Sequence, residues 1–242
     1  MDTRGVKITW CGHATFRIQS AGKTYYIDPF LAHNPACPEA EKNPKHADAI
    51  LLTHGHTDHL ADLLPLAKSS SAPVVCIIET GAWLASKGVP QSQLHAINKG
   101  GSVSVAGAKV TMVHALHSNG IDDGGRMVYG GDPAGLVIEF AEGLRIYHAG
   151  DTDVFGDMAL IAELYKPDLA LLPIGDFFTM GPRGAALACR LLKAPAVVPM
   201  HFGTFPVLTG TTEEFRNQMR TYSPSTEVIV LKPGETLGAP RS

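Results

Sequence analysis

The stretch Leu51-Leu-Thr-His54-Gly-His56-Thr-Asp58-His59-Leu60 places three histidines and an aspartate within six residues, directly after an apolar run. Histidines two positions apart at the end of an extended strand point to the same side and can aim their imidazoles into one pocket. Asp58 and His59 fall at the start of a predicted helix and can aim at a neighbouring point. Imidazole and carboxylate are ligands that zinc, manganese and iron accept. This one segment therefore predicts ligands for two metal ions.

The pattern H-x-H-x-D-H resembles the signature of the metallo-β-lactamase superfamily, and it stands here unaltered. That superfamily takes further ligands from a third histidine, from an aspartate after a strand and from a final histidine after another strand. The chain offers, in this order, Ala115-Leu-His117-Ser118, Tyr147-His-Ala-Gly-Asp151-Thr152 and Val197-Val-Pro-Met-His201-Phe202.

Among subgroups, the chain looks closest to uncharacterised metal-dependent hydrolases related to ascorbate-6-phosphate lactonase. The segments that carry this closer resemblance span nearly the whole sequence: Gly12-His13, Ile27-Asp-Pro-Phe30, Leu52-Thr-His-Gly-His-Thr-Asp-His59, His148-Ala-Gly-Asp-Thr152, Leu172-Pro-Ile-Gly-Asp176, Phe178-Thr-Met-Gly-Pro182 and Pro199-Met-His201. The resemblance implies an α+β fold, a four-layer αββα sandwich with the metals at one edge between two mixed sheets.

The resemblance also implies a ligand set. One metal would be held by His54, His56 and His117, and a second by Asp58, His59 and His201, with Asp151 bridging both. We expect two divalent ions, zinc first and manganese or iron as alternatives, because these positions include no thiolate. Each ion would have three or four protein ligands, which leaves room for a shared hydroxide. Asp58 and Asp151 would have the catalytic task of positioning the ions and this hydroxide.

Three further residues are expected near the pocket, each with an alternative role left open. His13 matches a family position near the pocket and would contact the substrate or support a ligand, unless it is a structural turn residue. Asp28 ends a predicted strand and would accept the second N–H of a metal-bound histidine, unless its role is local to the turn. Asp176 precedes a predicted helix start whose backbone N–H groups could bind an anionic substrate group; a helix cap and turn is the alternative.

The remaining histidines are expected outside the ligand set. His114 lies three residues before His117, so the two would face opposite sides of an extended strand, and we choose His117 as the ligand. His148 is expected to be a strand residue or a partner of a ligand. His33, His46 and His95 stand in polar, loop-like surroundings and are expected at the surface.

The pattern of apolar residues predicts about twice as many strands as helices. Strands are expected at residues 6–10, 24–27, 49–53, 74–78, 110–114, 136–140, 144–147, 169–173, 196–200 and 227–231. Helices are expected at residues 58–68, 80–87, 157–164, 182–192 and 212–220. Residues 119–135 contain six glycines and are expected to form a surface loop beside the site.

Composition favours a soluble cytoplasmic protein of one domain covering residues 1–242. The chain is 45% hydrophobic and 18% charged, and no apolar run is long enough for a signal peptide or a membrane span. Four scattered cysteines form no CxxC pair, which excludes a disulfide scaffold and a Cys-rich zinc site. A net charge of −3 without a basic run gives no sign of nucleic-acid binding. A small-molecule substrate is expected, and a homo-oligomer is compatible.

These features predict a metal-dependent hydrolase in which a dimetal-bound hydroxide attacks a lactone, ester or amide; phosphodiester hydrolysis is the alternative. No Gly-x-Ser-x-Gly elbow offers a competing nucleophile. Two other classes remain to be tested. A redox protein of the diiron type would usually carry a carboxylate in the signature and a flavin domain, and a non-catalytic metal-binding module would be expected to have lost ligands.

Overall fold

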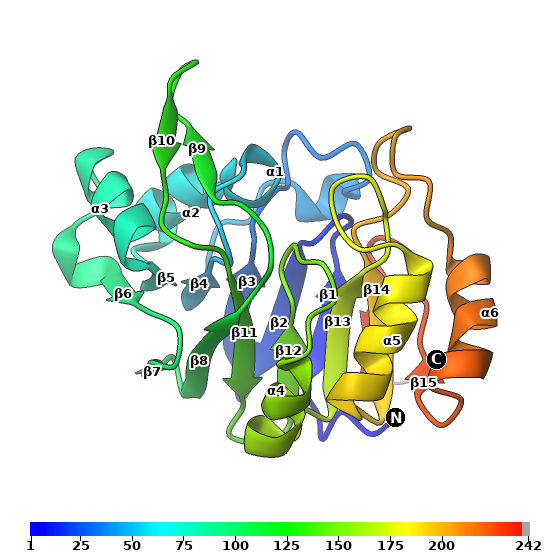
Figure 1. Ribbon diagram of the computed structural model, residues 1–242. Helices are drawn as coiled ribbons and strands as arrows, with labels where there is room; N and C mark the ends of the chain where they lie inside the picture. Colours follow the sequence, from blue (N-terminus) through cyan, green and yellow to red (C-terminus); the bar gives the residue numbers. More distant parts are fainter. Residues whose placement is uncertain (239–242) are drawn as a thin grey trace.

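The computed structural model describes residues 1–238, whose strands form two seven-stranded sheets and a separate two-stranded ribbon (Figure 1). The first sheet has the order β16 (Thr236–Leu237), β1 (Lys7–Trp10), β2 (Phe16–Ser20), β3 (Lys23–Ile27), β4 (Ala49–Leu51), β5 (Val74–Ile77) and β6 (Leu94–Ile97). The second has the order β15 (Glu227–Val228), β14 (Ala196–Met200), β13 (Leu169–Pro173), β12 (Arg145–His148), β11 (Ala134–Glu139), β8 (Ala108–His114) and β7 (Ser102–Val105). The ribbon pairs β9 (Gly120–Asp122) with β10 (Met127–Tyr129).

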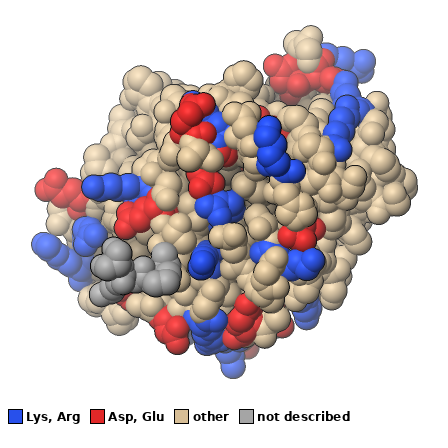
Figure 2. Space-filling model, turned by 180° about the vertical axis from the view of Figure 1, so that it is seen from behind, with Lys and Arg blue, Asp and Glu red and all other residues tan. Residues whose placement is uncertain are grey.

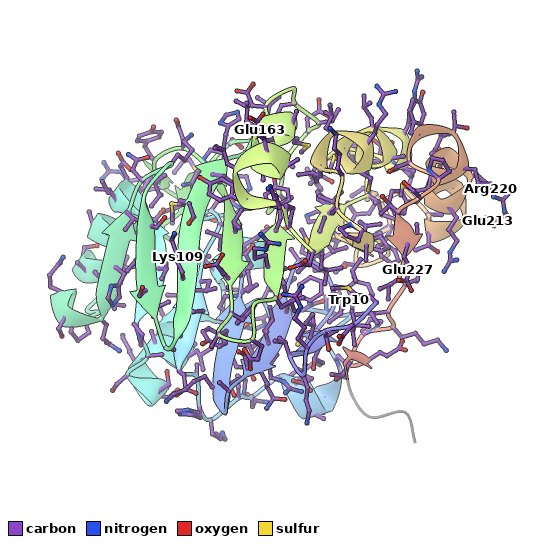
Figure 3. All side chains as sticks on the ribbon, turned by 90° about the horizontal axis from the view of Figure 1, so that it is seen from below. Trp10, Lys109, Glu163, Glu213, Arg220 and Glu227 are labelled. Atoms are coloured by element: carbon purple, nitrogen blue, oxygen red, sulfur yellow. The ribbon has the colours of Figure 1, made fainter. Side chains whose placement is uncertain are left out.

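Helices cover the outer faces of both sheets. Apolar residues of α2 (Leu63–Ser70) and α3 (Ile78–Ser86) pack with the first sheet, and α1 (Thr57–Leu60) precedes α2. The helices α4 (Met158–Tyr165), α5 (Pro182–Leu192) and α6 (Thr212–Tyr222) pack with the second sheet, as the view from below shows (Figure 3). Short 3-10 turns lie at Glu39–Glu41 and Gln91–Gln93. The predicted αββα sandwich is therefore confirmed.

The largest apolar cluster lies between the two sheets and holds them together. In β2 the buried positions alternate, so Phe16 and Ile18 face this cluster. Leu136 and Ile138 of β11 contribute from the opposite sheet. Since alternate strand residues point to opposite faces, each sheet also sends apolar side chains outward to its helices.

The helix predicted at residues 58–68 is wrong in one respect, because it is broken into α1 and α2. Pro65 lies in the first turn of α2. Its ring would clash with the carbonyl of Ala61 in a continuous helix, whereas a first-turn proline lacks only an N–H that would have no helical partner. Asp62, at the break, instead accepts hydrogen bonds from the amides of Leu31 at 2.6 Å and Ala32 at 3.1 Å.

Several strands were not predicted: β2, β6, β7, β16 and the ribbon strands. The ribbon lies inside the stretch expected to be a loop, and the strand expected at 227–231 ends at Val228. The position predicted for His95 is also wrong, since this residue lies half-buried on β6 rather than in an exposed loop. Short strands with polar residues are recognised only when a neighbouring strand pairs with them.

The distribution of charge on the surface and the length of the helices bear on whether the protein binds nucleic acid or spans a membrane. Figure 2 shows Lys and Arg side chains interspersed with Asp and Glu over the face that it displays. In the part of the chain that the structure describes, every helix is too short or too polar to cross a bilayer.

Candidate metal centre

Parallel strands of both sheets end at one edge of the sandwich, and the residues of the predicted site follow six of these strands. In the first sheet β1, β3 and β4 run in the same direction, as do β8, β12 and β14 in the second. The residues that follow these strands are His13, Asp28, the segment 54–59, His117, Asp151 and His201. The topology therefore gathers side chains from distant parts of the sequence at a single edge, as open α/β sheets do at their ligand sites.

The first cluster joins His54, His56, His117 and Asp151, whose ligand atoms all lie within 4.8 Å of one another. Nδ1 of His56 lies 3.0 Å from Nε2 of His54 and 3.3 Å from Nε2 of His117. Three ring nitrogens thus converge on one point. Nε2 of His56 points away from that point and lies 3.3 Å from Oγ of Ser118.

The second cluster joins His13, Asp58, His59 and His201 within the same 4.8 Å limit. Nε2 of His201 lies 3.9 Å from Oδ2 of Asp58. Nε2 of His13 lies 2.9 Å from that same oxygen. His13, which the sequence placed only near the pocket, therefore stands among the potential ligands of the second cluster.

Asp151 lies between the two clusters. Its Oδ1 is 3.3 Å from Nε2 of His59, and its Oδ2 is 3.1 Å from Nε2 of His201. On the other side, Oδ2 is 3.6 Å from Nε2 of His117 and 3.9 Å from Nε2 of His54. A carboxylate in this position reaches imidazoles of both clusters, as the predicted bridging role requires.

Several buried polar atoms at the centre of the site have no hydrogen-bond partner among the described residues. They are Nε2 of His59, both ring nitrogens of His201 and Oδ1 of Asp151. Buried polar groups are almost always satisfied in native proteins, so Nε2 of His59, Nε2 of His201 and Oδ1 of Asp151 together form a place where a further ligand fits. Their geometry and chemistry fit divalent metal ions.

A chain of hydrogen bonds from Asp28 orients two of the imidazoles. Nδ1 of His59 donates to Oδ2 of Asp28 at 2.8 Å, and the hydroxyl of Thr53 donates to the same oxygen at 2.7 Å. Because Oγ1 of Thr53 gives its proton to Asp28, it can accept one from Nδ1 of His54, 3.0 Å away. Both rings then carry their proton on Nδ1 and turn the lone pair of Nε2 toward the clusters.

The backbone at three of these positions is left-handed. His13, Asp28 and His201 have φ values of 56°, 47° and 56°, and each directly follows a strand or strand-end turn. This conformation costs a residue other than glycine about 1–2 kcal/mol. Such strain persists where the surrounding structure enforces it, and it concentrates at functional sites.

The electrostatics of the clusters favour bound cations. Burial lowers the pKa of His54, His56 and His117, so these rings are neutral and offer a lone pair. Burial would raise the pKa of Asp151, but His201 and His59 outweigh it and hold that pKa well below its usual range. Burial also lowers the pKa of His59, yet Asp151 and Asp28 raise it far more. The two carboxylates thus attract positive charge to the point where the ring nitrogens meet.

The other predicted residues lie outside the clusters. His114 is exposed and its ring contacts Phe155, so the choice of His117 over His114 agrees with its position. His148 is buried, with Nε2 2.9 Å from the carbonyl of Ala14 and Nδ1 accepting from the amide of Gly150. It thereby holds the turn that carries Asp151. His33 and His46 are exposed, as expected.

Asp176 is exposed and stays out of both clusters. Its Oδ1 accepts from the amide of Phe177 at 2.8 Å, which is the turn role left open above. The amides of Thr179 and Met180 are also bonded within the protein, to the carbonyls of Asp176 and Thr152. These two amides precede α5 and are not free to bind an anionic group, whereas binding of such a group by the amides at the start of α5 itself stays a prediction.

Three residues at the site were missed in the sequence. They are Thr53, Thr204, whose hydroxyl lies 3.1 Å from Nδ1 of His13, and Asn119, whose Oδ1 accepts from the amide of Gly55 at 2.6 Å. Of these three, only Thr53 could have been found from the sequence. It is adjacent to the signature, and a hydroxyl beside a metal ligand often orients that ligand. Thr204 and Asn119 lie in loops, and the sequence does not predict the backbone conformation of these loops.

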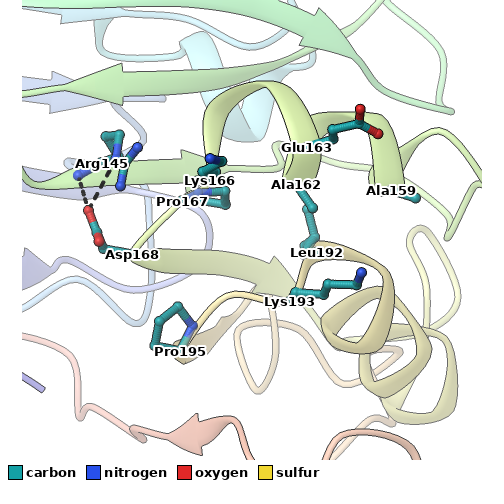
Figure 4. A pocket seen from close by; sticks show the side chains of 10 residues that line it. All are labelled: Arg145, Ala159, Ala162, Glu163, Lys166, Pro167, Asp168, Leu192, Lys193 and Pro195. Carbon is teal, nitrogen blue, oxygen red and sulfur yellow. Dashed lines mark hydrogen bonds and ion pairs between the residues drawn. The ribbon is translucent and has the colours of Figure 1, made fainter.

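A hollow of about 530 Å³ lies at the opposite end of the second sheet and is separate from the metal centre (Figure 4). Arg145 begins β12, while Asp168 and Pro195 immediately precede β13 and β14. Nε of Arg145 lies 3.5 Å from Oδ2 of Asp168. The hollow thus lies at the amino ends of these strands, whereas the two clusters lie at their carboxyl ends. The hollow and the clusters share no residue.

Comparison with known proteins shows the family of the chain. The model of the beta-lactamase superfamily domain matches residues 23–202. A UPF0173 metal-dependent hydrolase of Koribacter versatilis (strain Ellin345) is 52% identical, with 98% of this chain and 99% of that protein covered. The metallo hydrolase Igni18 of Ignicoccus hospitalis superposes with a TM-score of 0.83 at 35% identity, covering 96% of this chain and 97% of the other. The chain therefore belongs to the beta-lactamase superfamily and, within it, to the UPF0173 family of metal-dependent hydrolases.

Proposed function

We propose that this hydrolase cleaves a lactone, ester or amide bond of a small molecule, using two divalent ions, zinc by preference, held in the two clusters. The observation that carries the proposal is the position of Asp151, whose carboxylate reaches imidazoles of both clusters within 3.1–3.9 Å. One such residue can keep two ions close enough to act on the same bond. Zinc is favoured because the donors are mostly imidazoles.

Two ions held there would lower the pKa of a water between them and offset the negative charge that develops on the attacked carbonyl. The residues of the chain supply the geometry. Asp28 and Thr53 fix the rings of His59 and His54, as described above. Asp58, 30% exposed and beside His13, faces the open side of the site, where it can orient the water.

Ser118 is the competing nucleophile, since its hydroxyl lies 3.3 Å from Nε2 of His56. Nδ1 of His56, however, is the atom that converges with the other ring nitrogens. A His56 bound to metal through Nδ1 keeps its proton on Nε2 and donates it to Ser118, so it cannot act as a base. The arrangement therefore supports attack by water.

The test is a matched substrate panel on zinc-loaded protein: an aryl ester, a lactone, an anilide and a phosphodiester. We expect turnover of carbonyl substrates, loss of turnover on chelation, and a label in the product when a single turnover is run in oxygen-18 water. Turnover of the phosphodiester alone would replace carbonyl hydrolysis by the alternative chemistry. A covalent acyl group on Ser118, detected by mass spectrometry, would overturn attack by water.

A further inference from the structure

The ribbon β9–β10 stands at the metal edge of the sandwich (Figure 1). A hollow lies against this ribbon. The hollow has a volume of about 450 Å³ and begins at His117 and Ser118, beside the first cluster. Its apolar lining comes from Met127, Val128, Tyr129 and Pro133. One end of this hollow is thus formed by a predicted metal ligand and the rest by the ribbon and its flanks.

The base of the ribbon is fixed to the metal-binding segment. Asn119 accepts a hydrogen bond from the amide of Gly55, between His54 and His56, and its Nδ2 donates to the carbonyl of Gly130 at 2.7 Å. Ile121, only 1% exposed, packs on Gly55. The ribbon therefore keeps a defined position relative to the first cluster.

Two large side chains of the ribbon are left to solvent beside the hollow. Met127 and Tyr129 are each 69% exposed, and they lie two residues apart, so they share one face of β10. Adjacent exposed apolar side chains next to a catalytic centre indicate a binding surface.

The lining of the hollow is nearly free of unpaired charge. Asp132 is the one Asp or Glu in its lining, and the carboxylate of Asp132 is bonded by Nζ of Lys99 at 3.1 Å and by the hydroxyl of Tyr129 at 3.2 Å. Neither Lys nor Arg lines the hollow. A phosphate or carboxylate group would find no cationic partner there, whereas an apolar group would bury the ribbon side chains.

The cluster itself opens toward this side. His54, His59 and His201 are almost fully buried. In contrast, His56 and His117 are half-buried. Asp58 is also partly exposed, at 30%. A molecule bound at the metals can therefore approach past Asp58, His56 and His117, and a substituent on it can extend from His117 into the hollow.

We propose that this hollow binds an uncharged apolar group of the substrate, an alkyl chain or an aryl ring attached to the bond that is cleaved. This inference rests on the proposed function, which identifies the cleaved bond as a lactone, ester or amide. It adds a substrate class, apolar esters, lactones or amides, and two specificity-determining residues, Met127 and Tyr129.

The first test measures binding and needs no turnover. Zinc-loaded protein is titrated calorimetrically with acetohydroxamate, butyrohydroxamate, hexanohydroxamate and octanohydroxamate, which chelate metal and differ only in alkyl length. We expect the dissociation constant to fall about fourfold per added methylene until the hollow is filled. A dissociation constant that does not depend on length would overturn the proposal.

The variant Met127→Ala/Tyr129→Ala should flatten this dependence, because it removes the apolar face of β10. Leu160→Ala is the matched control, since Leu160 is also exposed, at 52%, but lies on α4. If the double variant does not fold, Met127→Ala alone should reduce the slope. An equal slope in the variants and the wild type would also overturn the proposal.

A series of p-nitrophenyl esters with the same alkyl chains as the hydroxamates distinguishes the proposed carbonyl hydrolysis from the proposed apolar subsite. A length-dependent kcat/KM that the double variant reduces most for long chains supports both. No ester turnover together with length-dependent hydroxamate binding would contradict the proposed carbonyl chemistry and leave the apolar subsite supported.

Discussion

The backbone amide of His201 donates a hydrogen bond of 2.9 Å to the carbonyl of His13, and the two imidazole rings lie 3.8 Å apart between centroids. His13 follows β1 in the first sheet and His201 follows β14 in the second. This bond joins the two sheets at the metal edge, with both residues in the left-handed conformation. The second cluster therefore depends on the packing of the sheets, and each variant below should be judged by both metal content and stability.

Asp151→Asn should fold normally yet lose one metal ion preferentially and most of its activity. The change is nearly isosteric, but it removes the negative charge that offsets repulsion between two dications. Metal content is measured by mass spectrometry after dialysis, next to thermal unfolding. Asp153→Asn, at an exposed position two residues away, is the control. Two tightly held ions and normal turnover in Asp151→Asn would remove Asp151 from the site.

His56→Ala and His201→Ala should weaken different ions, because the two residues belong to different clusters. Each variant is expected to retain about one ion, and titration with a chromophoric chelator reports how tightly it is held. The ligand assignment would be wrong if either variant kept both ions and full activity.

Asp28→Asn should lower metal affinity by about 10- to 100-fold, the usual effect of losing a residue that orients a ligand. Asp28 accepts from Nδ1 of His59 and from both the amide and the hydroxyl of Thr53. The amide group of asparagine would face one of these donors with its own N–H. Competition with a chelator measures the loss, and an unchanged affinity would show that Asp28 serves only the turn.

Gly55→Ala should destabilise the fold by about 1–3 kcal/mol, as overpacking of a buried site does. A Cβ at this position would lie 2.5 Å from Cγ1 of Ile121 and 3.0 Å from Oδ1 of Asn119. Gly156→Ala is the matched control, because a Cβ there would meet nothing within 4 Å. Denaturant unfolding of both variants checks the difference, and equal stabilities would contradict the packing of the ribbon on Gly55.

The thiols should be unreactive in the native protein. All four cysteines are free and buried, and burial raises the pKa of Cys37, Cys76 and Cys189 to about 12. A raised thiol pKa means that these groups stay protonated at pH 8, and the thiolate is the reactive form. Ellman's reagent should therefore detect four thiols only after unfolding. Rapid reaction of a thiol in the folded protein would show that its surroundings open.

The sequence by itself determined the fold class and most of the clustered residues. The spacing of His54, His56, Asp58 and His59 at a strand end is local, so it could be read without knowing the rest of the fold. The resemblance then supplied His117, Asp151 and His201, and the structure brings all seven together. Asp28 was also identified, because it ends a strand in a position where acceptors for histidine are common.

Only the tertiary structure decided the remaining features. His13 lies in the second cluster because the carbonyl that follows β1 meets the amide that follows β14, a contact between residues far apart in the sequence. Asn119 and the ribbon were hidden in a glycine-rich stretch, where the order of β9 and β10 comes from their pairing and from packing on Gly55. Asp176 stays out of both clusters, and its carboxylate accepts from the amide of Phe177 in its own loop. Local patterns record the chemistry that a side chain can offer, whereas its partners are set by the packing of the two sheets.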